Sequence, residues 1–106
     1  MENIRVVFIS IPHDEARKFA RSIVEERLAA CVNIVPRITS FFWWENEVQT
    51  DEEALLILKT TQPKIDALID FVKHEHPYDI PEILFLPVAE GLPDYINWVI
   101  EEVGKV

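Results

Sequence analysis

Hydrophobic and polar positions follow each other in blocks along the chain, and each block has the period of one kind of secondary structure. The run Ile4–Ile11 is short, is rich in β-branched residues and is ended by Pro12, which predicts a buried strand. Apolar residues then recur at helical spacing from Ala16 to Leu28, with acidic residues at the front of the segment and basic residues behind them. This second block predicts an amphipathic helix.

The next block, residues 29–44, reads as one long strand. Its even positions are apolar almost throughout, whereas its odd positions are mixed at first and aromatic at the end. The tip, Phe41–Trp44, therefore requires burial on both faces, which one small domain can hardly provide, and we expect something outside the protomer to cover it. Residues 45–47 predict the turn of a hairpin, because Asn46 tolerates positive φ, and a return strand follows from Val48 to Lys59.

The remaining blocks predict a helix, a strand and a last helix. Thr60 or Thr61 can cap the second helix, and Pro77 ends it. Ile83–Val88 is a short apolar strand, and residues 91–94 lead into a C-terminal helix. The order β-α-β-β-α-β plus a helix predicts an α+β fold of the ferredoxin-like type, with four antiparallel strands and two helices on one face.

The length and net charge of the chain limit the classes of function that it can have. A chain of 106 residues predicts a single domain, 1–106. With 10 Lys and Arg against 19 Asp and Glu, the net charge of −9 repels phosphate backbones, so we expect no nucleic acid and favour cations or basic partners. Only two glycines argue against a glycine-rich phosphate loop. One cysteine, no signal peptide and no apolar run of membrane length predict a cytoplasmic protein without a membrane segment.

The titratable residues form no strong motif. His74 and His76 are two residues apart, which on a helix is about 200° of rotation, so both cannot bind one ion and solvated or helix-end roles are favoured. For Cys31, burial as a small hydrophobic side chain is favoured over a role as nucleophile or ligand. The five carboxylates within residues 45–53 are interpreted as a solvated hairpin.

The segment His76–Ile83 is the most informative stretch. Two prolines fix its backbone between a helix and a strand and hold His, Tyr, Asp and Glu side chains in set directions. Such a loop either carries function or is only a connection whose polar groups satisfy the backbone, and the residues leave both interpretations open. Lys59 is the expected cationic partner of Glu82 or of an anionic ligand.

Several segments together resemble one family. They are Leu-Ala-Ala-Cys-Val-Asn-Ile at 28–34, Ser-Phe-Phe-Trp-Trp-Glu at 40–45, Leu-Lys-Thr at 58–60, His-Pro-Tyr-Asp-Ile-Pro-Glu-Ile at 76–83, and Leu-Pro-Val at 86–88. In this order, and with Tyr95 three residues before Trp98, the chain is similar to CutA, the divalent-cation tolerance proteins. The resemblance implies a tight homotrimer similar in architecture to PII signalling proteins, with long hairpins that extend into the next subunit, and no catalytic activity.

The resemblance also implies a ligand-binding cleft between subunits. Matched residue by residue, the cleft has Trp44 from the hairpin, Lys59 from the return strand, and Tyr78 and Glu82 from the loop, with His76 as the metal-binding residue.

This chain departs at two places from the copper ligands described for the family. The first-strand cysteine position is Ile9, and the residue before His76 is Glu75 rather than histidine. The chain therefore keeps one of three ligands, so we expect no required cofactor and only weak binding of a divalent metal such as copper.

Three functional hypotheses follow. The leading one is a non-enzymatic, trimeric CutA-like protein of the cytosol in the response to divalent metals. The alternative is a PII-like signalling or scaffold trimer that binds a small anion or a protein and has no physiological metal role. An enzyme with His76 and Glu82 as an acid/base pair ranks last, because no nucleophile or cofactor motif accompanies them.

Overall fold

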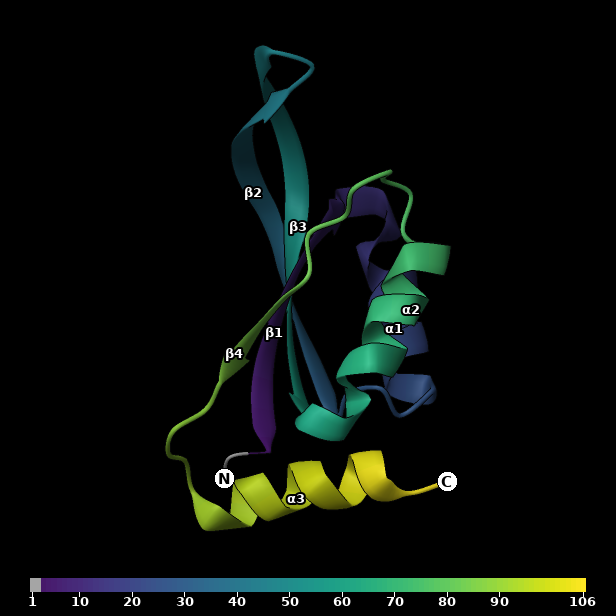
Figure 1. Cartoon of the computed structure of the whole chain (residues 1–106), viewed down its shortest axis with the longest axis vertical. Helices are drawn as coiled ribbons and strands as arrows, with labels where there is room; N and C mark the ends of the chain where they lie inside the picture. The colour runs from purple at the N-terminus through teal and green to yellow at the C-terminus, as the bar shows by residue number, and fades with distance from the viewer. Residues whose placement is uncertain (1–2) are drawn as a thin grey trace.

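The computed structural model describes residues 3–106, which form a four-stranded antiparallel sheet, two helices on one face and a third helix across one end (Figure 1). The strand order is β2-β3-β1-β4. In chain order the elements are β1 (Ile4–Pro12), η1 (His13–Glu15), α1 (Ala16–Glu25), β2 (Cys31–Trp44), β3 (Glu47–Thr61), η2 (Gln62–Lys64), α2 (Ile65–Glu75), β4 (Leu84–Pro87) and α3 (Pro93–Gly104). This arrangement confirms the α+β fold and the β-α-β-β-α-β order predicted from the sequence.

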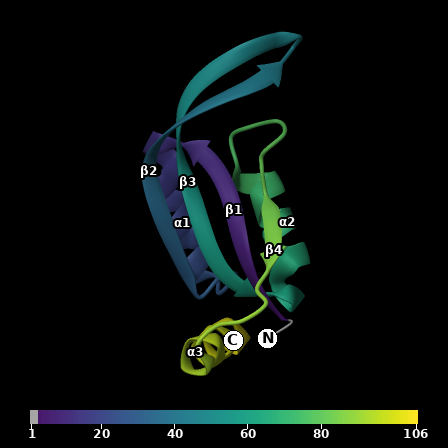
Figure 2. The same cartoon turned by 90° about the vertical axis from the view of Figure 1, so that its left-hand side faces the viewer.

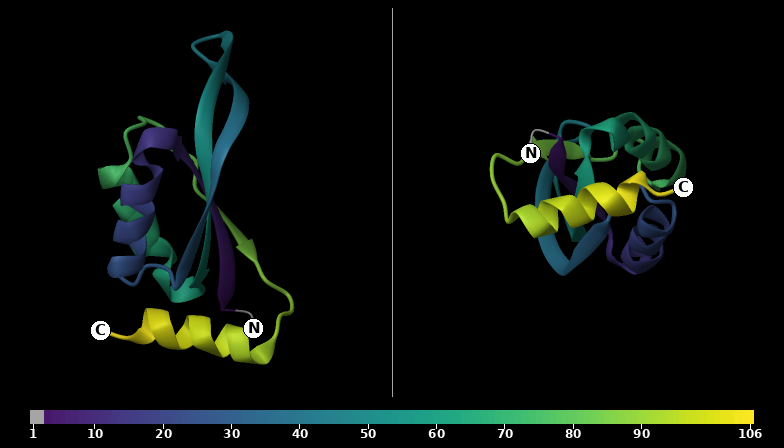
Figure 3. Two further views of the ribbon diagram at one scale, coloured as in Figure 1. Left: turned by 180° about the vertical axis from the view of Figure 1, so that it is seen from behind. Right: turned by 90° about the horizontal axis from the view of Figure 1, so that it is seen from below.

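The core lies between one face of the sheet and the helices α1 and α2. Alternate residues of the two central strands point toward the helices and are fully buried, among them Ile9 of β1 and Leu56 of β3. The helices meet through Phe19 and Phe71, whose ring centroids are 5.3 Å apart, and Figure 3 shows the two helices side by side. The 3.6-residue period of their apolar positions therefore turns one stripe of each helix into this core.

The other face of the sheet is also apolar, and no helix covers it within the described chain (Figure 2). Phe8 of β1 points to this side, as do Leu84 and Leu86 of the edge strand β4, which are 57% and 41% exposed. The residues of β1 therefore lie alternately on two apolar faces of the sheet, and the helices of the protomer cover only one of these faces.

The hairpin formed by β2 and β3 extends beyond the body of the protein, along the longest dimension of 44 Å (Figure 1). Its turn consists of Glu45 and Asn46, with φ values of 51° and 64°. Two consecutive positive φ values match the right-handed twist of the flanking strands, which is the usual geometry of two-residue hairpin loops. The turn predicted at residues 45–47 is confirmed at Glu45 and Asn46, whereas Glu47 already belongs to β3.

The ends of the helices differ from the sequence-based expectation in one detail. Thr61 precedes the turn η2 but makes no side-chain capping bond, and the Thr60 hydroxyl instead donates to the backbone oxygen of Leu28 at 2.7 Å. The predicted threonine cap is therefore wrong, because both threonines still belong to β3 and Thr60 is turned into the core. The end of α2 before Pro77 is confirmed.

At the end of α1, Arg27 has a φ of 57°, and the amides of Arg27 and Leu28 bond back to Val24 and Ile23. The Arg27 guanidinium reaches α3, where it donates to the backbone oxygen of Glu102 at 2.8 Å and to its carboxylate at 3.2 Å. Arg27 therefore ties the end of α1 to the C-terminal helix.

Candidate functional site

A cavity of about 830 Å³ lies under the hairpin, beside the loop that connects α2 to β4. Its walls come from segments that are distant in sequence: the aromatic run Phe41–Trp44, the strand β3 through Asp51 and Glu53, and loop residues between Pro77 and Glu82. Figure 2 shows the hairpin curving over this loop. The sequence brings these parts together because the hairpin is long and because two prolines fix the path of the loop.

Tyr78 and Glu53 form a partly buried polar contact in the wall of the cavity. The Tyr78 hydroxyl donates to the Glu53 carboxylate at 2.8 Å, and Glu53 is 5% exposed. Burial raises the pKa of Tyr78, and the hydrogen bond and negative charge of Glu53, with that of Asp51, raise it further. The phenol therefore stays neutral and serves as a donor that satisfies a buried carboxylate.

His76 lies behind Tyr78 and is 7% exposed. Its Nε2 donates to the backbone oxygen of Ser10 at 2.8 Å, and its Nδ1 accepts from the backbone N–H of Tyr78 at 3.1 Å. A carbonyl only accepts and an amide N–H only donates, so the ring is neutral with its proton on Nε2.

This tautomer bears on the metal role predicted for His76. Both ring nitrogens are used within the protomer, so coordination of a metal ion would break the bond to Tyr78 or to Ser10. The solvated or helix-end roles favoured from the spacing of the histidines are confirmed, since His74 is exposed on α2 and His76 follows α2 directly, although His76 is buried there. A metal role for His76 stays a prediction.

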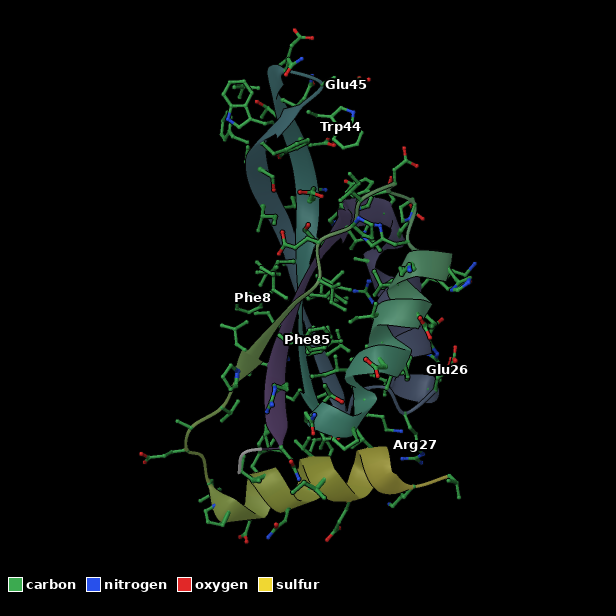
Figure 4. All side chains as sticks on the ribbon, in the orientation of Figure 1. Phe8, Glu26, Arg27, Trp44, Glu45 and Phe85 are labelled. Atoms are coloured by element: carbon green, nitrogen blue, oxygen red, sulfur yellow. The ribbon has the colours of Figure 1, made fainter. Side chains whose placement is uncertain are left out.

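Of the predicted ligand-binding residues, Trp44, Tyr78 and Glu82 line the cavity together. Trp44 is 41% exposed, and Figure 4 shows its side chain on the side of the hairpin toward the loop. Glu82 accepts from the Ser10 hydroxyl at 3.3 Å, which places its carboxylate at the end of β1.

Lys59 is not part of this cavity. It lies six residues along β3 from Glu53, which is about 20 Å at the spacing of a strand. Its ammonium donates to the side-chain oxygen of Asn33 and lies 3.8 Å from the sulfur of Cys31. The expected pairing of Lys59 with Glu82 is therefore wrong, because the two residues sit toward opposite ends of the sheet.

Cys31 is also placed differently from the expectation. It is partly exposed at the start of the edge strand β2, beside Lys59 and Asn33, rather than buried as an ordinary hydrophobic side chain. Burial raises the pKa of Tyr95, and the neighbouring Cys31 sulfur raises it further, so Tyr95 of α3 completes this polar group.

The sequence did not identify Glu53 or Ser10 as site residues. Glu53 was interpreted as one of five solvated hairpin carboxylates, which is wrong because Tyr78 covers it. One feature of the sequence could have identified Glu53. It directly precedes the apolar run that begins at Ala54, which places it at the junction of the hairpin and the body. Ile9, at the family's cysteine position, is fully buried against the helices.

The comparisons with known proteins agree with this architecture. The family model described as "CutA1 divalent ion tolerance protein" matches residues 5–102. The chain belongs to the CutA divalent-cation tolerance family. Among CutA relatives, the "Divalent-cation tolerance protein CutA" of Thermus thermophilus is 51% identical over 100 residues, covering 93% of this chain and 97% of the relative. "Protein CutA 1, chloroplastic" of rice is 50% identical over 95 residues, covering 89% of this chain and 54% of the relative, so the chain spans about half the length of that protein.

Solved CutA structures show the same fold. The CutA1 of Oryza sativa superposes with a TM-score of 0.91 at 46% identity, covering 94% of this chain and 93% of that chain. The Thermus thermophilus protein gives a TM-score of 0.90 at 49% identity, covering 93% and 97%. Within residues 3–106, no helix has the length and apolar character that a membrane crossing requires.

Proposed function

We propose that this CutA protein works as a non-enzymatic, PII-like homotrimer in the response to divalent metal ions such as copper, with a binding cleft where subunits meet. The observation that carries the assembly is the apolar surface that the protomer leaves exposed. It comprises the open face of the sheet and the hairpin tip, where Phe41 and Trp43 are 71% and 74% exposed. A stable interface buries about 800 Å² per partner, roughly a ninth of the 7046 Å² surface of the described protomer.

Sedimentation velocity tests the assembly. We expect the 12.4 kDa chain to sediment as a species of three times this mass. Trp43→Ser removes an exposed aromatic side chain from the tip and should lower the association constant. Val24→Ser removes an exposed apolar side chain, 39% exposed, from α1 on the helical side of the molecule and should not. A wild-type chain that sediments at 12.4 kDa would contradict the assembly.

The role in the response to divalent metals is supported by the family to which the chain belongs. Isothermal titration with copper and zinc salts tests it on the wild type, on His76→Ala and on His74→Ala, in which an exposed histidine of α2 is removed as a control. We expect weak heat that His76→Ala abolishes and His74→Ala retains. Identical heats in all three proteins would remove His76 as a ligand, and an absence of heat in the wild type would remove the metal role itself.

The proposal places the protein in the cytoplasm and assigns it no required cofactor. A single cysteine supports a reducing compartment, since the chain can form no internal disulfide. The CutA relative from Archaeoglobus fulgidus is described as periplasmic, so cell fractionation with an antibody against this chain is the direct test. Recovery in the periplasmic fraction would overturn the cytoplasmic location.

A further inference from the structure

The cavity under the hairpin combines aromatic rings with carboxylates, and this combination has a chemical preference. We propose that it binds a small organic cation that carries a substituted ammonium group, with the ammonium between the aromatic hairpin and the carboxylates of the loop and β3. The inference rests on the proposed function in one respect, because it takes this cavity to be the protomer's part of the cleft, and it names the class of ligand.

The hairpin aromatics divide into two sets by exposure. Phe41 and Trp43 are 71% and 74% exposed, whereas Phe42 and Trp44, on the alternate face, are 39% and 41% exposed. Figure 4 shows Trp44 on the side of the hairpin that overhangs the loop. All four residues contribute to the wall of the cavity, and the less exposed set lies on the same face of the hairpin as Asp51 and Glu53. Ring faces attract a cation within about 6 Å of their centroid, and tryptophan does so best.

The opposite walls are acidic. Asp51, Glu53, Asp79 and Glu82 all line the cavity, and no lysine or arginine of the described chain does. Within residues 3–106, none of these four carboxylates forms an ion pair. The raised pKa of Tyr78, to which the charges of Glu53 and Asp51 contribute, reports the same negative field at the floor of the cavity. This negative field favours the binding of a cation and disfavours the anionic ligand that Lys59 was expected to bind.

The size and polarity of the walls favour an organic cation. A cavity of about 830 Å³ is large enough for a small molecule, and binding cavities of this kind are commonly about 300–1,000 Å³. A substituted ammonium holds its water weakly, so it can lose that water and contact the indole of Trp44 while it faces Glu82. A strongly hydrated metal ion gains little from a ring face, because the bound water separates the two.

Choline and its neutral isostere 3,3-dimethylbutan-1-ol test the inference by isothermal titration, at constant ionic strength and on the assembled protein. The two probes have the same shape and differ in charge. We expect choline to bind at least about tenfold more tightly than the alcohol. Glu82→Gln should weaken choline binding by about fivefold, since it removes one partly solvated charge. Trp44→Leu should weaken it similarly through loss of the ring face.

Glu101→Gln is the matched control, since it makes the same change in net charge on α3, at the end of the molecule opposite the hairpin (Figure 1). It should leave choline binding unchanged. Equal affinity for choline and the alcohol, or equal loss in the Glu82 and Glu101 variants, would overturn the inference. A third outcome would also overturn it: the wild type gives no heat with choline, and Glu82→Gln dissociates in the ultracentrifuge. In that case a basic side chain of a second copy would fill the cavity. A trimer that binds no choline refutes the ligand class alone, and a monomer that binds choline refutes the assembly alone.

Discussion

Tyr78→Phe removes a single hydroxyl group and leaves one oxygen of the Glu53 carboxylate without its donor. Glu53 is 5% exposed and the bond measures 2.8 Å, so solvent does not readily replace the lost hydroxyl. A hydrogen bond to a charged group contributes about 1.5–3 kcal/mol. We therefore expect Tyr78→Phe to lower the free energy of unfolding by about 2 kcal/mol per protomer.

A double-mutant cycle with Glu53→Gln isolates the charge in this bond. The amide oxygen of glutamine still accepts from Tyr78, but a bond between neutral groups contributes only about 1 kcal/mol. Tyr78→Phe should therefore cost about half as much in the glutamine background as in the wild type. Equal costs in the two backgrounds would refute the assignment of the bond to a charged carboxylate.

Urea denaturation followed by circular dichroism measures these free energies, at one fixed protein concentration because the proposed assembly would add to the apparent stability. Tyr95→Phe is the control. Tyr95 is 40% exposed, and its hydroxyl interacts with a cysteine rather than with a buried carboxylate, so its removal should cost clearly less.

The same tyrosine predicts a dependence on alkaline pH. The folded protein raises the pKa of Tyr78 above the ordinary value of 10.0, so the folded state keeps a proton that the unfolded state releases. The stability contributed by the neutral phenol is complete below pH 10 and is lost as the pH rises toward the raised value. Tyr78→Phe should therefore lose less stability than the wild type between pH 9.5 and 11.5. A parallel decline in both proteins would contradict this assignment.

Three further expectations concern the body of the protein. Arg27→Gly should be more stable than Arg27→Ala by about 1 kcal/mol in thermal unfolding, because both lose the contacts with Glu102 but only alanine remains strained at a φ of 57°; the reverse order would refute the strain. Hydrogen bonds from Lys105 and Arg27 lower the pKa of Glu102, so the stability difference between wild type and Glu102→Gln should be present above pH 4.5 and vanish as the pH falls through the lowered value. Leu56→Ala should cost about 2–5 kcal/mol in urea denaturation, since the side chain is fully buried, and a cost below about 1 kcal/mol would show that the site collapses.

The order of elements could be predicted because its signals are local. Pro12 and Pro77 end a strand and a helix where they occur, and Asn46 marks the turn through its own backbone preference. The open face of the sheet could not be separated from the buried one in the same way. Ile9 and Phe8 are both apolar, and only the position of the helices decides that the first is covered and the second is not.

The sequence allowed a prediction for those residues of the candidate site that lie on rigid segments. Tyr78 and Glu82 share one proline-fixed loop, and Trp44 lies at the end of a hairpin long enough to reach over it. Lys59 lies outside this cavity of the protomer, and the sequence could not show this because a strand pattern gives the period of the residues and not their height along the sheet. Glu53 was missed because its burial arises from a tyrosine 25 residues away in the chain.

The position of β1 in the sheet has a consequence for synthesis on the ribosome. This first strand lies between β3 and β4, so one of its edges is paired only when residues 84–87 have left the exit tunnel. Until then Val6 and Phe8 present an apolar strand with unpaired amides, next to a hairpin that has already formed. This stage lasts until residues 84–87 are free to pair, so a delay in their release from the ribosome should increase aggregation of the nascent chain without any change in the protein sequence.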